Sequence, residues 1–265
     1  MNMGKTRLQV FKIGGAIIDQ PEQLRFFLTQ IAQQKGAKIL VHGGGQRATQ
    51  LAEQLGIPQT LVQGRRVTDT ASLEIVTMVY GGLINKQLVA QLQAEQCPAL
   101  GVCGADGDLL RARKRPNLGL DFGWVGDLVQ VNTALLDRWL GQGLTPVIAP
   151  LSHDGQGQLL NTNADTIAQA VAQALAPAFQ VELYYFFEKK GVLADPISDQ
   201  SLLTVLDREG YHSLLTTGTI SNGMLPKLEN AFKALENGVK KVVIGSATQV
   251  NEVLNGLAGT QLKPT

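Results

Sequence analysis

The sequence predicts an α/β protein, a three-layer αβα sandwich in which helices cover both faces of a central, mostly parallel sheet. Two observations carry this prediction. Short β-rich runs alternate with stretches of helical period along all 265 residues, and such alternation is typical of a parallel sheet. Several of the β-rich runs are almost entirely apolar, as expected for strands that are buried on both faces.

Six segments are expected to be strands because they are short, apolar and rich in β-branched or aromatic residues. They are residues 8–13, 38–41, 99–102, 145–149, 180–187 and 240–244. Apolar residues at helical spacing predict helices over residues 24–31 and 225–235. Asn132 is expected to cap a third helix that ends near Gly141.

One stretch breaks this alternation. Residues 104–131 are rich in Gly, Asp and basic residues and show no helical period, which predicts a β-hairpin excursion over one edge of the domain. The least periodic point near the fifth predicted strand lies at residues 176–178. We therefore expect an N-terminal lobe of residues 1–178 that binds the substrate and a C-terminal lobe of residues 179–265 that binds a nucleotide.

The charge balance, the length of the apolar segments and the spacing of the histidines exclude several classes of protein. Lys and Arg total 23 against 22 Asp and Glu, a net charge of +1, so the basic footprint of a nucleic-acid-binding protein is missing. The one basic run, residues 111–115, is expected to be a solvated loop edge. No segment reaches the ~18 apolar residues of a membrane span, and the three histidines lack metal-ligand spacing. We expect a cytoplasmic protein without a nucleic-acid partner, a membrane partner or a metal site.

Two predicted strands run into glycine-rich turns that are followed by helices. The first carries Lys12 near its end and leads into Gly14 and Gly15, and the second ends at His42 and leads into three glycines, residues 43–45. Glycine lets the backbone approach a ligand closely, and a helix N-terminus attracts anions. Turns that follow parallel strands lie at one edge of a sheet, so these two predict a cradle for phosphate or carboxylate groups.

Lys227 is a second candidate lysine, because it stands near a helix start, where a lysine is unfavourable unless an anion is bound. The alternative for Lys227 and for Lys12 is a solvated side chain. Asn163 or Asp165 fits a helix cap, and Asp165 could also hold lysines in place. His42 is expected to be a core histidine whose polar atoms are satisfied.

A competing pattern is G-x-G-x-x-A at residues 43–48, with Asp69 roughly twenty residues further on. It is typical of dinucleotide-binding oxidoreductases, although there the motif normally follows the first strand rather than the second. A catalytically silent binding protein is a third alternative.

Five segments, in this order, resemble the amino acid kinase family. They are residues 10–15 (VFKIGG), 39–45 (ILVHGGG), 64–68 (GRRVT), 159–165 (LLNTNAD) and 222–227 (NGMLPK). Residues 104–110 and 121–128 are also similar to a hairpin region of that family. The resemblance covers almost the whole chain and implies the amino acid kinase (carbamate kinase-like) fold. The members it resembles most transfer the γ-phosphate of ATP, with its Mg²⁺, to the side-chain carboxylate of an N-acyl-L-glutamate in arginine biosynthesis.

The resemblance also implies roles for individual residues. Lys12 and Lys227 would neutralise the transferring phosphoryl group, and Asp165 would orient both lysines. Arg66 would bind the substrate α-carboxylate, and Asn161 would hold the amide. Gly44 and Gly45 would contact the acyl amino acid, and Gly15 and Gly44 would donate backbone hydrogen bonds to the phosphoryl group. The remaining nucleotide- or phosphate-binding positions would be Gly14, Glu188, Lys190, Gly191, Leu193, Thr219 and Ser221.

The nucleotide side departs from the family pattern. Where the family usually carries a small-residue and Asp motif, this chain has FEKKGV at residues 187–192, and Asn222 replaces a common Asp. Other members of the family, such as glutamate 5-kinase, aspartokinase, carbamate kinase and UMP kinase, are alternatives. The residues leave the identity of the acyl group open, because an acetyl or a succinyl group would leave the α-carboxylate contact unchanged.

By the same resemblance we expect a homodimer that is insensitive to arginine. Arginine-inhibited members carry an N-terminal helix that links dimers into hexamers, and the roughly seven residues before the first strand are too few for such a helix. The apolar helix over residues 72–91 is the candidate dimer surface. Its apolar residues exceed what one buried face requires, namely Leu73, Val76, Val79 and Leu83.

Overall fold

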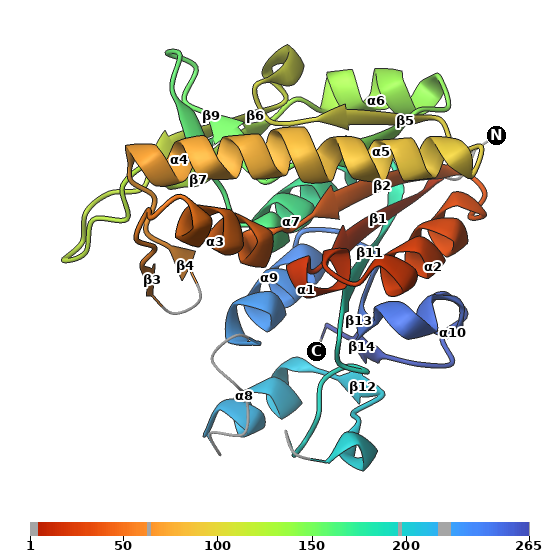
Figure 1. Ribbon diagram of the computed structural model, residues 1–265. Coiled ribbons are helices and arrows are strands. Elements are labelled where there is room, and N and C mark those ends of the chain that lie inside the picture. Colours follow the sequence, from red (N-terminus) through yellow and green to blue (C-terminus); the bar gives the residue numbers. More distant parts are fainter. Residues whose placement is uncertain (1–4, 63–64, 196–197, 217–223, 265) are drawn as a thin grey trace.

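The computed structural model describes residues 5–62, 65–195, 198–216 and 224–264, and it contains an eight-stranded sheet at its centre (Figure 1). Along the sheet the strand order is β12-β14-β13-β11-β1-β2-β8-β5. The strands are β1 Arg7–Ile13, β2 Ala37–His42, β5 Ala99–Val102, β8 Thr145–Ile148, β11 Gln180–Phe187, β12 Val205–Leu206, β13 Lys241–Ser246 and β14 Thr260–Leu262. Only the β13–β14 pairing is antiparallel among these neighbours. The predicted fold class and all six predicted strands are confirmed, whereas the two short strands β12 and β14 at one end of the sheet were not foreseen.

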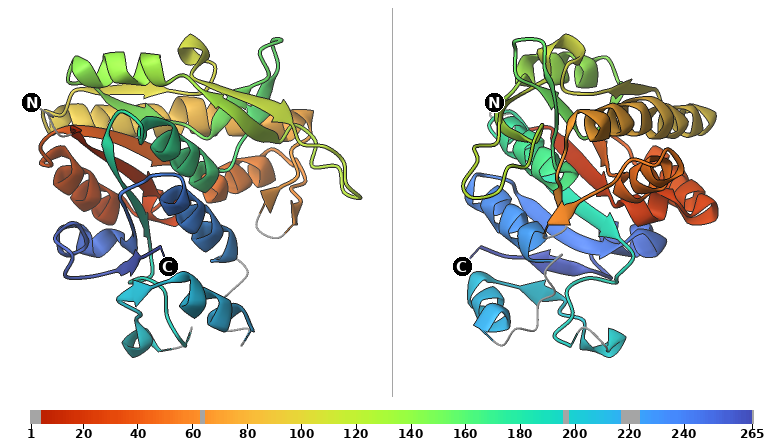
Figure 2. Two further views of the ribbon diagram at one scale, coloured as in Figure 1. Left: turned by 180° about the vertical axis from the view of Figure 1, so that it is seen from behind. Right: turned by 60° about the vertical axis from the view of Figure 1, so that its left-hand side comes forward.

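Helices cover both faces of this sheet, so the chain forms three layers (Figure 2). One face packs against α6 Thr133–Gly141, α7 Ala164–Leu175, α8 Arg208–Thr216 and α9 Leu225–Glu236. The other face packs against α2 Pro21–Ala32, α3 Gly45–Gln54, α10 Val250–Leu254 and a long helix over residues 70–94. The short helices are α1 Gly15–Ile18 and three 3₁₀ turns at Asp106–Asp108, Asp199–Ser201 and Ala247–Gln249. Asn132 caps α6 through a hydrogen bond from the Leu135 N–H, as predicted.

A second sheet lies beside the first and has the order β10-β9-β6-β7. Its strands are β6 Leu110–Lys114, β7 Gly126–Val131, β9 Leu151–His153 and β10 Leu159–Asn161. β6 and β7 form an antiparallel pair within the stretch where the sequence predicted a hairpin excursion. The sequence did not indicate that β9 and β10 extend it. Among the described residues, the remaining strands form a two-stranded ribbon, β3 Leu61–Val62 with β4 Arg65–Arg66.

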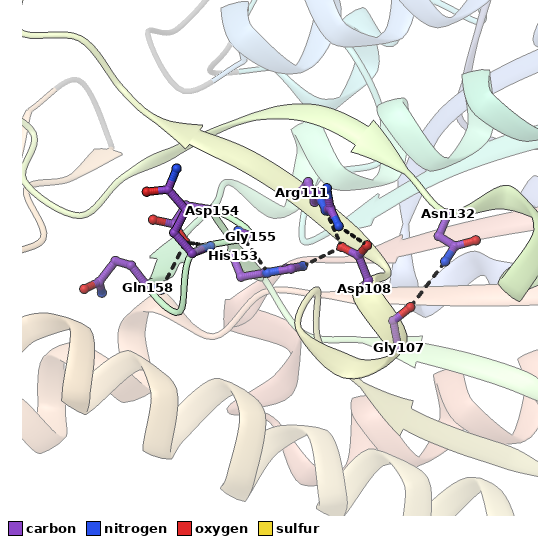
Figure 3. Close-up of polar contacts among 9 residues, drawn as sticks. Gly107, Asp108, Arg111, Asn132, His153, Asp154, Gly155 and Gln158 are labelled. Atoms are coloured by element: carbon purple, nitrogen blue, oxygen red, sulfur yellow. Dashed lines mark hydrogen bonds and ion pairs between the residues drawn. The ribbon is translucent and has the colours of Figure 1, made fainter.

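Side chains hold β9 against β6, where the two strands share only one paired position. The Asp108 carboxylate accepts two hydrogen bonds from Arg111, at 2.7 and 2.6 Å, and one from His153 Nε2 at 2.9 Å (Figure 3). His153 Nδ1 in turn accepts from the Gly155 N–H at 3.2 Å. This cluster fixes the start of the β9–β10 hairpin, and β10 ends at Asn161.

The expected division between two lobes falls within a continuous sheet. β11, which follows residue 178, pairs with β1 along seven consecutive positions. The division at residues 178 and 179 therefore stays a prediction. In the described part of the chain, no helix combines the length and apolar character needed to cross a membrane.

The long helix over residues 70–94 changes type twice. It consists of α4 Thr70–Val76, a π-helical segment Thr77–Ile84 and α5 Asn85–Ala94. The sequence predicted a helix here but gave no sign of the π segment. One detail of that prediction was wrong: Leu73, Val76 and Val79 are buried inside the chain, and the exposed apolar residues are Leu83 and Met78.

Candidate active site

The glycine turns after β1 and β2 lie in contact with each other. The Gly43 N–H donates to the Ile13 carbonyl at 3.0 Å, and the Gly14 N–H donates to the Phe186 carbonyl at 2.9 Å. A Cβ atom on Gly15 would lie 3.2 Å from the Gly44 nitrogen, so neither turn leaves room for a side chain between them. Parallel pairing of β1 with β2 puts both turns at one edge of the sheet, as the sequence predicted.

This contact leaves backbone donors free. Among the described residues, the N–H groups of Gly15, Gly44 and Gly45 have no hydrogen-bond acceptor. Gly45 begins the ten-residue helix α3, whose positive dipole end favours an anion. The turns therefore present convergent donors to a negatively charged group.

Lys12 and Lys227 meet at one carboxylate. Lys12 Nζ lies 2.7 Å from Asp165 Oδ1, and Lys227 Nζ lies 2.6 Å from Asp165 Oδ2. The three residues come from β1, from the first turn of α7 and from the first turn of α9. Asn163 caps α7 by accepting hydrogen bonds from the N–H groups of Asp165 and Thr166, which fixes the carboxylate at the helix start.

Burial makes this triad electrostatically unusual. Lys12 and Asp165 are 7% and 5% exposed, so the solvated alternative for Lys12 was wrong, whereas the Lys227 side chain keeps 23% exposure. Burial alone would raise the pKa of Asp165, but the attraction of Lys12 and Lys227 outweighs it and holds that pKa well below its usual range. Burial lowers the pKa of Lys12, Asp165 opposes that shift, and the charge of Lys227 adds to it. Two ammonium groups thus share one carboxylate, an arrangement that a further anion would complete.

Arg66 is buried and held by three acceptors. Nη2 donates to the Gly45 carbonyl at 2.8 Å and to Thr49 Oγ1 at 2.7 Å, and Nη1 donates to Gln59 Oε1. A planar guanidinium in a fixed position suits a carboxylate ligand. Asn161 is oriented similarly, because its Nδ2 donates to Thr68 Oγ1 at 2.9 Å.

These groups line one cavity of about 230 Å³. Its walls include Lys12, Gly15, Gly44, Gly45, Arg66, Tyr80, Asn161, Asp165 and Lys227, together with Arg65 and Arg115. The structure therefore brings together every predicted catalytic and substrate-binding residue, from six separate segments of the chain. Thr49, Gln59, Thr68 and Tyr80 support this site and were missed, because no local sequence pattern distinguishes them.

The basic run at residues 111–115 differs from its prediction. Residues 111–114 belong to strand β6 rather than to a loop edge. Arg115 reaches the cavity wall and donates to Asp127 Oδ1 through Nε and Nη2, at 3.0 and 2.6 Å.

Four of the predicted nucleotide positions, Glu188, Lys190, Gly191 and Leu193, lie beyond the end of β11 and do not line this cavity, whereas Gly15 does. Glu188 and Lys190 are exposed, and Gly191 is buried. A Cβ atom on Gly191 would lie 2.6 Å from Thr260 Oγ1, and Leu193 forms an isolated bridge to Leu202. Gly14 lies at the turn after β1 and packs on Phe186 and Phe187. The predictions for Thr219, Ser221 and Asn222 fall outside the described residues.

The sequence pattern of the amino acid kinase family matches residues 7–246. The chain belongs to the amino acid kinase family. An acetylglutamate kinase of Parabacteroides distasonis is 50% identical over 246 residues, which cover 93% of this chain and 96% of that protein. This membership decides against the dinucleotide-binding alternative.

Solved structures agree with this amino acid kinase assignment at the level of the fold. N-acetylglutamate synthase from Neisseria gonorrhoeae, in complex with coenzyme A and N-acetyl-glutamate, superposes with a TM-score of 0.81 at 24% identity, over 97% of this chain and 59% of that one. Carbamate kinase from Giardia lamblia bound to AMP-PNP gives a TM-score of 0.71 at 13% identity over the full length of both chains.

Proposed function

We propose that this amino acid kinase transfers the γ-phosphate of ATP to the side-chain carboxylate of an N-acyl-L-glutamate, with N-acetyl-L-glutamate as the first candidate. The observation that carries the proposal is the convergence of Lys12, Lys227 and three free glycine N–H groups on one cavity. The acetylglutamate kinase of Parabacteroides distasonis, similar over 93% of this chain, supports the choice of substrate and a place in arginine biosynthesis.

The chemistry needs charge stabilisation more than proton transfer. The attacking carboxylate is already ionised at neutral pH, so no general base is required. The obstacle is repulsion between two anions, and fixed cations and N–H donors reduce it in the transition state. In this mechanism Lys12 and Lys227 neutralise the phosphoryl oxygens, Asp165 keeps both ammonium groups in place, and Gly15 and Gly44 donate hydrogen bonds to the same group.

The substrate would be held on the opposite side of the cavity. Arg66 would bind the α-carboxylate, Asn161 the amide, and Gly44 with Gly45 the acyl amino acid backbone. Three acceptors already fix the Arg66 guanidinium, so binding would cost little side-chain entropy.

The phosphoryl donor would be ATP with its Mg²⁺, the metal entering as part of the nucleotide. Carbamate kinase from Giardia lamblia, which shares the fold, was solved with AMP-PNP. The nucleotide would contact the turn after β1 and the segment after β11. The proposed residues are Gly14, Glu188, Lys190, Gly191, Leu193, Thr219 and Ser221.

The active form would be a cytoplasmic homodimer joined through the helix over residues 70–94. Met78 and Leu83 are apolar and 53% and 42% exposed on its π-helical segment, and burying them would stabilise a dimer. Light scattering tests this assembly, and a monomer at micromolar concentration would contradict it.

Substrate-dependent release of ADP tests the proposed function. The panel would be N-acetyl-L-glutamate, N-succinyl-L-glutamate, L-glutamate, L-aspartate, carbamate and UMP, with hydroxylamine present to trap an acyl phosphate. We expect turnover with at least one N-acyl-L-glutamate and a hydroxamate product in equal amount to ADP. Turnover only with carbamate, UMP or a free amino acid would overturn the proposal, and the two acyl compounds together would identify the acyl group.

A further inference from the structure

His42 is a fully buried imidazole that the proposed mechanism does not use. It ends β2 directly before the glycine turn, and its exposed fraction is 0%. Its Nδ1 lies 2.8 Å from the Gly43 carbonyl oxygen, and its Nε2 lies 3.2 Å from Asn85 Nδ2. Both ring nitrogens are therefore engaged, one by the glycine turn and the other by the long helix.

The neighbours of Asn85 fix the tautomer of His42. Asn85 Nδ2 also donates to the Val147 carbonyl at 2.9 Å, and Asn85 Oδ1 accepts from Lys86 Nζ at 3.1 Å. The amide nitrogen must then face the imidazole, and since it can only donate, His42 Nε2 is the acceptor. The proton of the neutral ring stands on Nδ1, which donates to the Gly43 carbonyl.

This hydrogen bond determines where the next N–H group points. In a planar trans peptide the carbonyl of Gly43 and the N–H of Gly44 lie on opposite sides of the bond. Holding the carbonyl against the imidazole turns the Gly44 N–H away from it. The Gly44 nitrogen lies 3.2 Å from where a Cβ on Gly15 would stand, and its N–H has no acceptor among the described residues. Gly15 and Gly44 both line the cavity that holds the two lysines.

The π-helical segment explains why Asn85 reaches His42. A π turn takes one residue more than an α turn, which rotates everything after it by about 100° on the helix surface. Asn85 is the first residue after this segment, and its exposed fraction is also 0%. The same segment presses on Gly44, where a Cβ would collide with Ile84 Cδ1 and lie 3.1 Å from Tyr80 Cδ1.

We propose that His42 and Asn85 are positioning residues for phosphoryl transfer, which hold the Gly43–Gly44 peptide group so that the Gly44 N–H stays directed at the transferring phosphoryl group. The proposal rests on the function proposed above. Glycine peptides rotate easily when nothing restrains them, and a donor stabilises a transition state best when it needs no reorganisation. Neither side chain touches substrate; both act through the backbone of the glycine turn.

Two substitutions at His42 separate its two hydrogen bonds. His42→Asn keeps an N–H donor one bond from Cγ, where Nδ1 stands, and loses the contact with Asn85. His42→Gln keeps a polar group near the position of Nε2 and loses the donor to Gly43. We expect kcat of His42→Gln to fall about tenfold or more, up to the hundredfold scale of one lost transition-state donor. His42→Asn should stay close to wild type in kcat, because an amide N–H has no tautomer for Asn85 to fix. Its smaller side chain should leave a cavity and lower the melting temperature more than His42→Gln does.

A second measurement does not depend on turnover. In protein with ¹⁵N-labelled glycine, the Gly44 amide signal should shift on addition of MgATP in the wild type and in His42→Asn, and should shift less in His42→Gln. Equal kcat in wild type and His42→Gln, or equal losses in both variants, would overturn the positioning role. If the wild type transfers phosphate to no compound of the panel, the proposed function fails. In that case the Gly44 amide signal alone tests the positioning role, and a response to MgATP that is the same in His42→Gln as in the wild type would refute it.

Discussion

Replacing Asp165 with Asn tests the buried charge arrangement most directly. The substitution keeps the shape of the side chain but removes the only carboxylate that contacts Lys12 and Lys227 within 2.7 Å among the described residues. One of the two ammonium groups must then face an amide N–H. The loss is larger for Lys12, because its side chain is 8% exposed, whereas that of Lys227 is 23% exposed and has more contact with water.

The size of the effect follows from this burial. Removing one partner of a buried ion pair typically costs about 3–5 kcal/mol of unfolding free energy. An independent ceiling comes from the alternative of deprotonating Lys12: from its ordinary pKa of 10.5 to pH 7, this costs about 4.8 kcal/mol at 1.36 kcal/mol per pH unit. The two estimates of the lost unfolding free energy agree. The ceiling falls as pH rises, because the unfolded lysine binds more protons than the folded one, so the loss should shrink to about 2 kcal/mol at pH 9.

Urea unfolding followed by circular dichroism measures these free energies in single and double variants. Adding Lys12→Met to Asp165→Asn removes the stranded charge and should recover at least half of the lost stability. Adding Lys227→Met is the matched control and should recover little, because that ammonium can reach water. The reasoning is wrong if Asp165→Asn costs less than about 1 kcal/mol, well below the range for a broken buried pair, or if the Lys227 substitution restores stability as well as the Lys12 substitution does.

Four other outcomes are expected. Lys227→Ala should lower kcat about a hundredfold, the scale of one lost electrostatic contact, and near-normal turnover in steady-state assays would contradict its role. Arg66→Lys keeps the charge but loses the planar fork, so KM for the acyl amino acid should rise while KM for ATP changes little; an equal rise in both would show that Arg66 does not bind the acyl amino acid. Burial, assisted by the charge of Lys86, lowers the pKa of His42 to about 4. The stability that neutral His42 provides should be complete above about pH 6.5 and be lost as the pH falls towards 4. The melting temperature of His42→Asn should not show this dependence on pH. Gly44→Ala should lower the melting temperature because Gly44 has φ 152° and its Cβ would collide with Ile84, and an unchanged melting temperature would refute that packing.

Local patterns in the sequence determined most of the fold. The strands and helices arise from apolar spacing over a few residues, and Asn132 and Asn163 cap their helices through bonds to N–H groups two or three residues away. The glycine turns after β1 and β2 were equally visible, because parallel strands bring the turns that follow them to one edge of the sheet. Such short-range interactions involve residues that are close together in the sequence, so a local sequence pattern reveals them.

What the tertiary structure decided depends on residues that are distant in sequence. Lys227 and Asp165 are 62 residues apart and His42 and Asn85 are 43 apart, yet each pair lies within hydrogen-bond distance. Their meeting depends on strand order, on the packing of α7 against α9 and on the π-helical segment, none of which has a local signature here. By itself the sequence identified Lys12 as a candidate, but only the packing of β1 beneath α7 made it a buried lysine, because burial is a property of everything that surrounds a side chain.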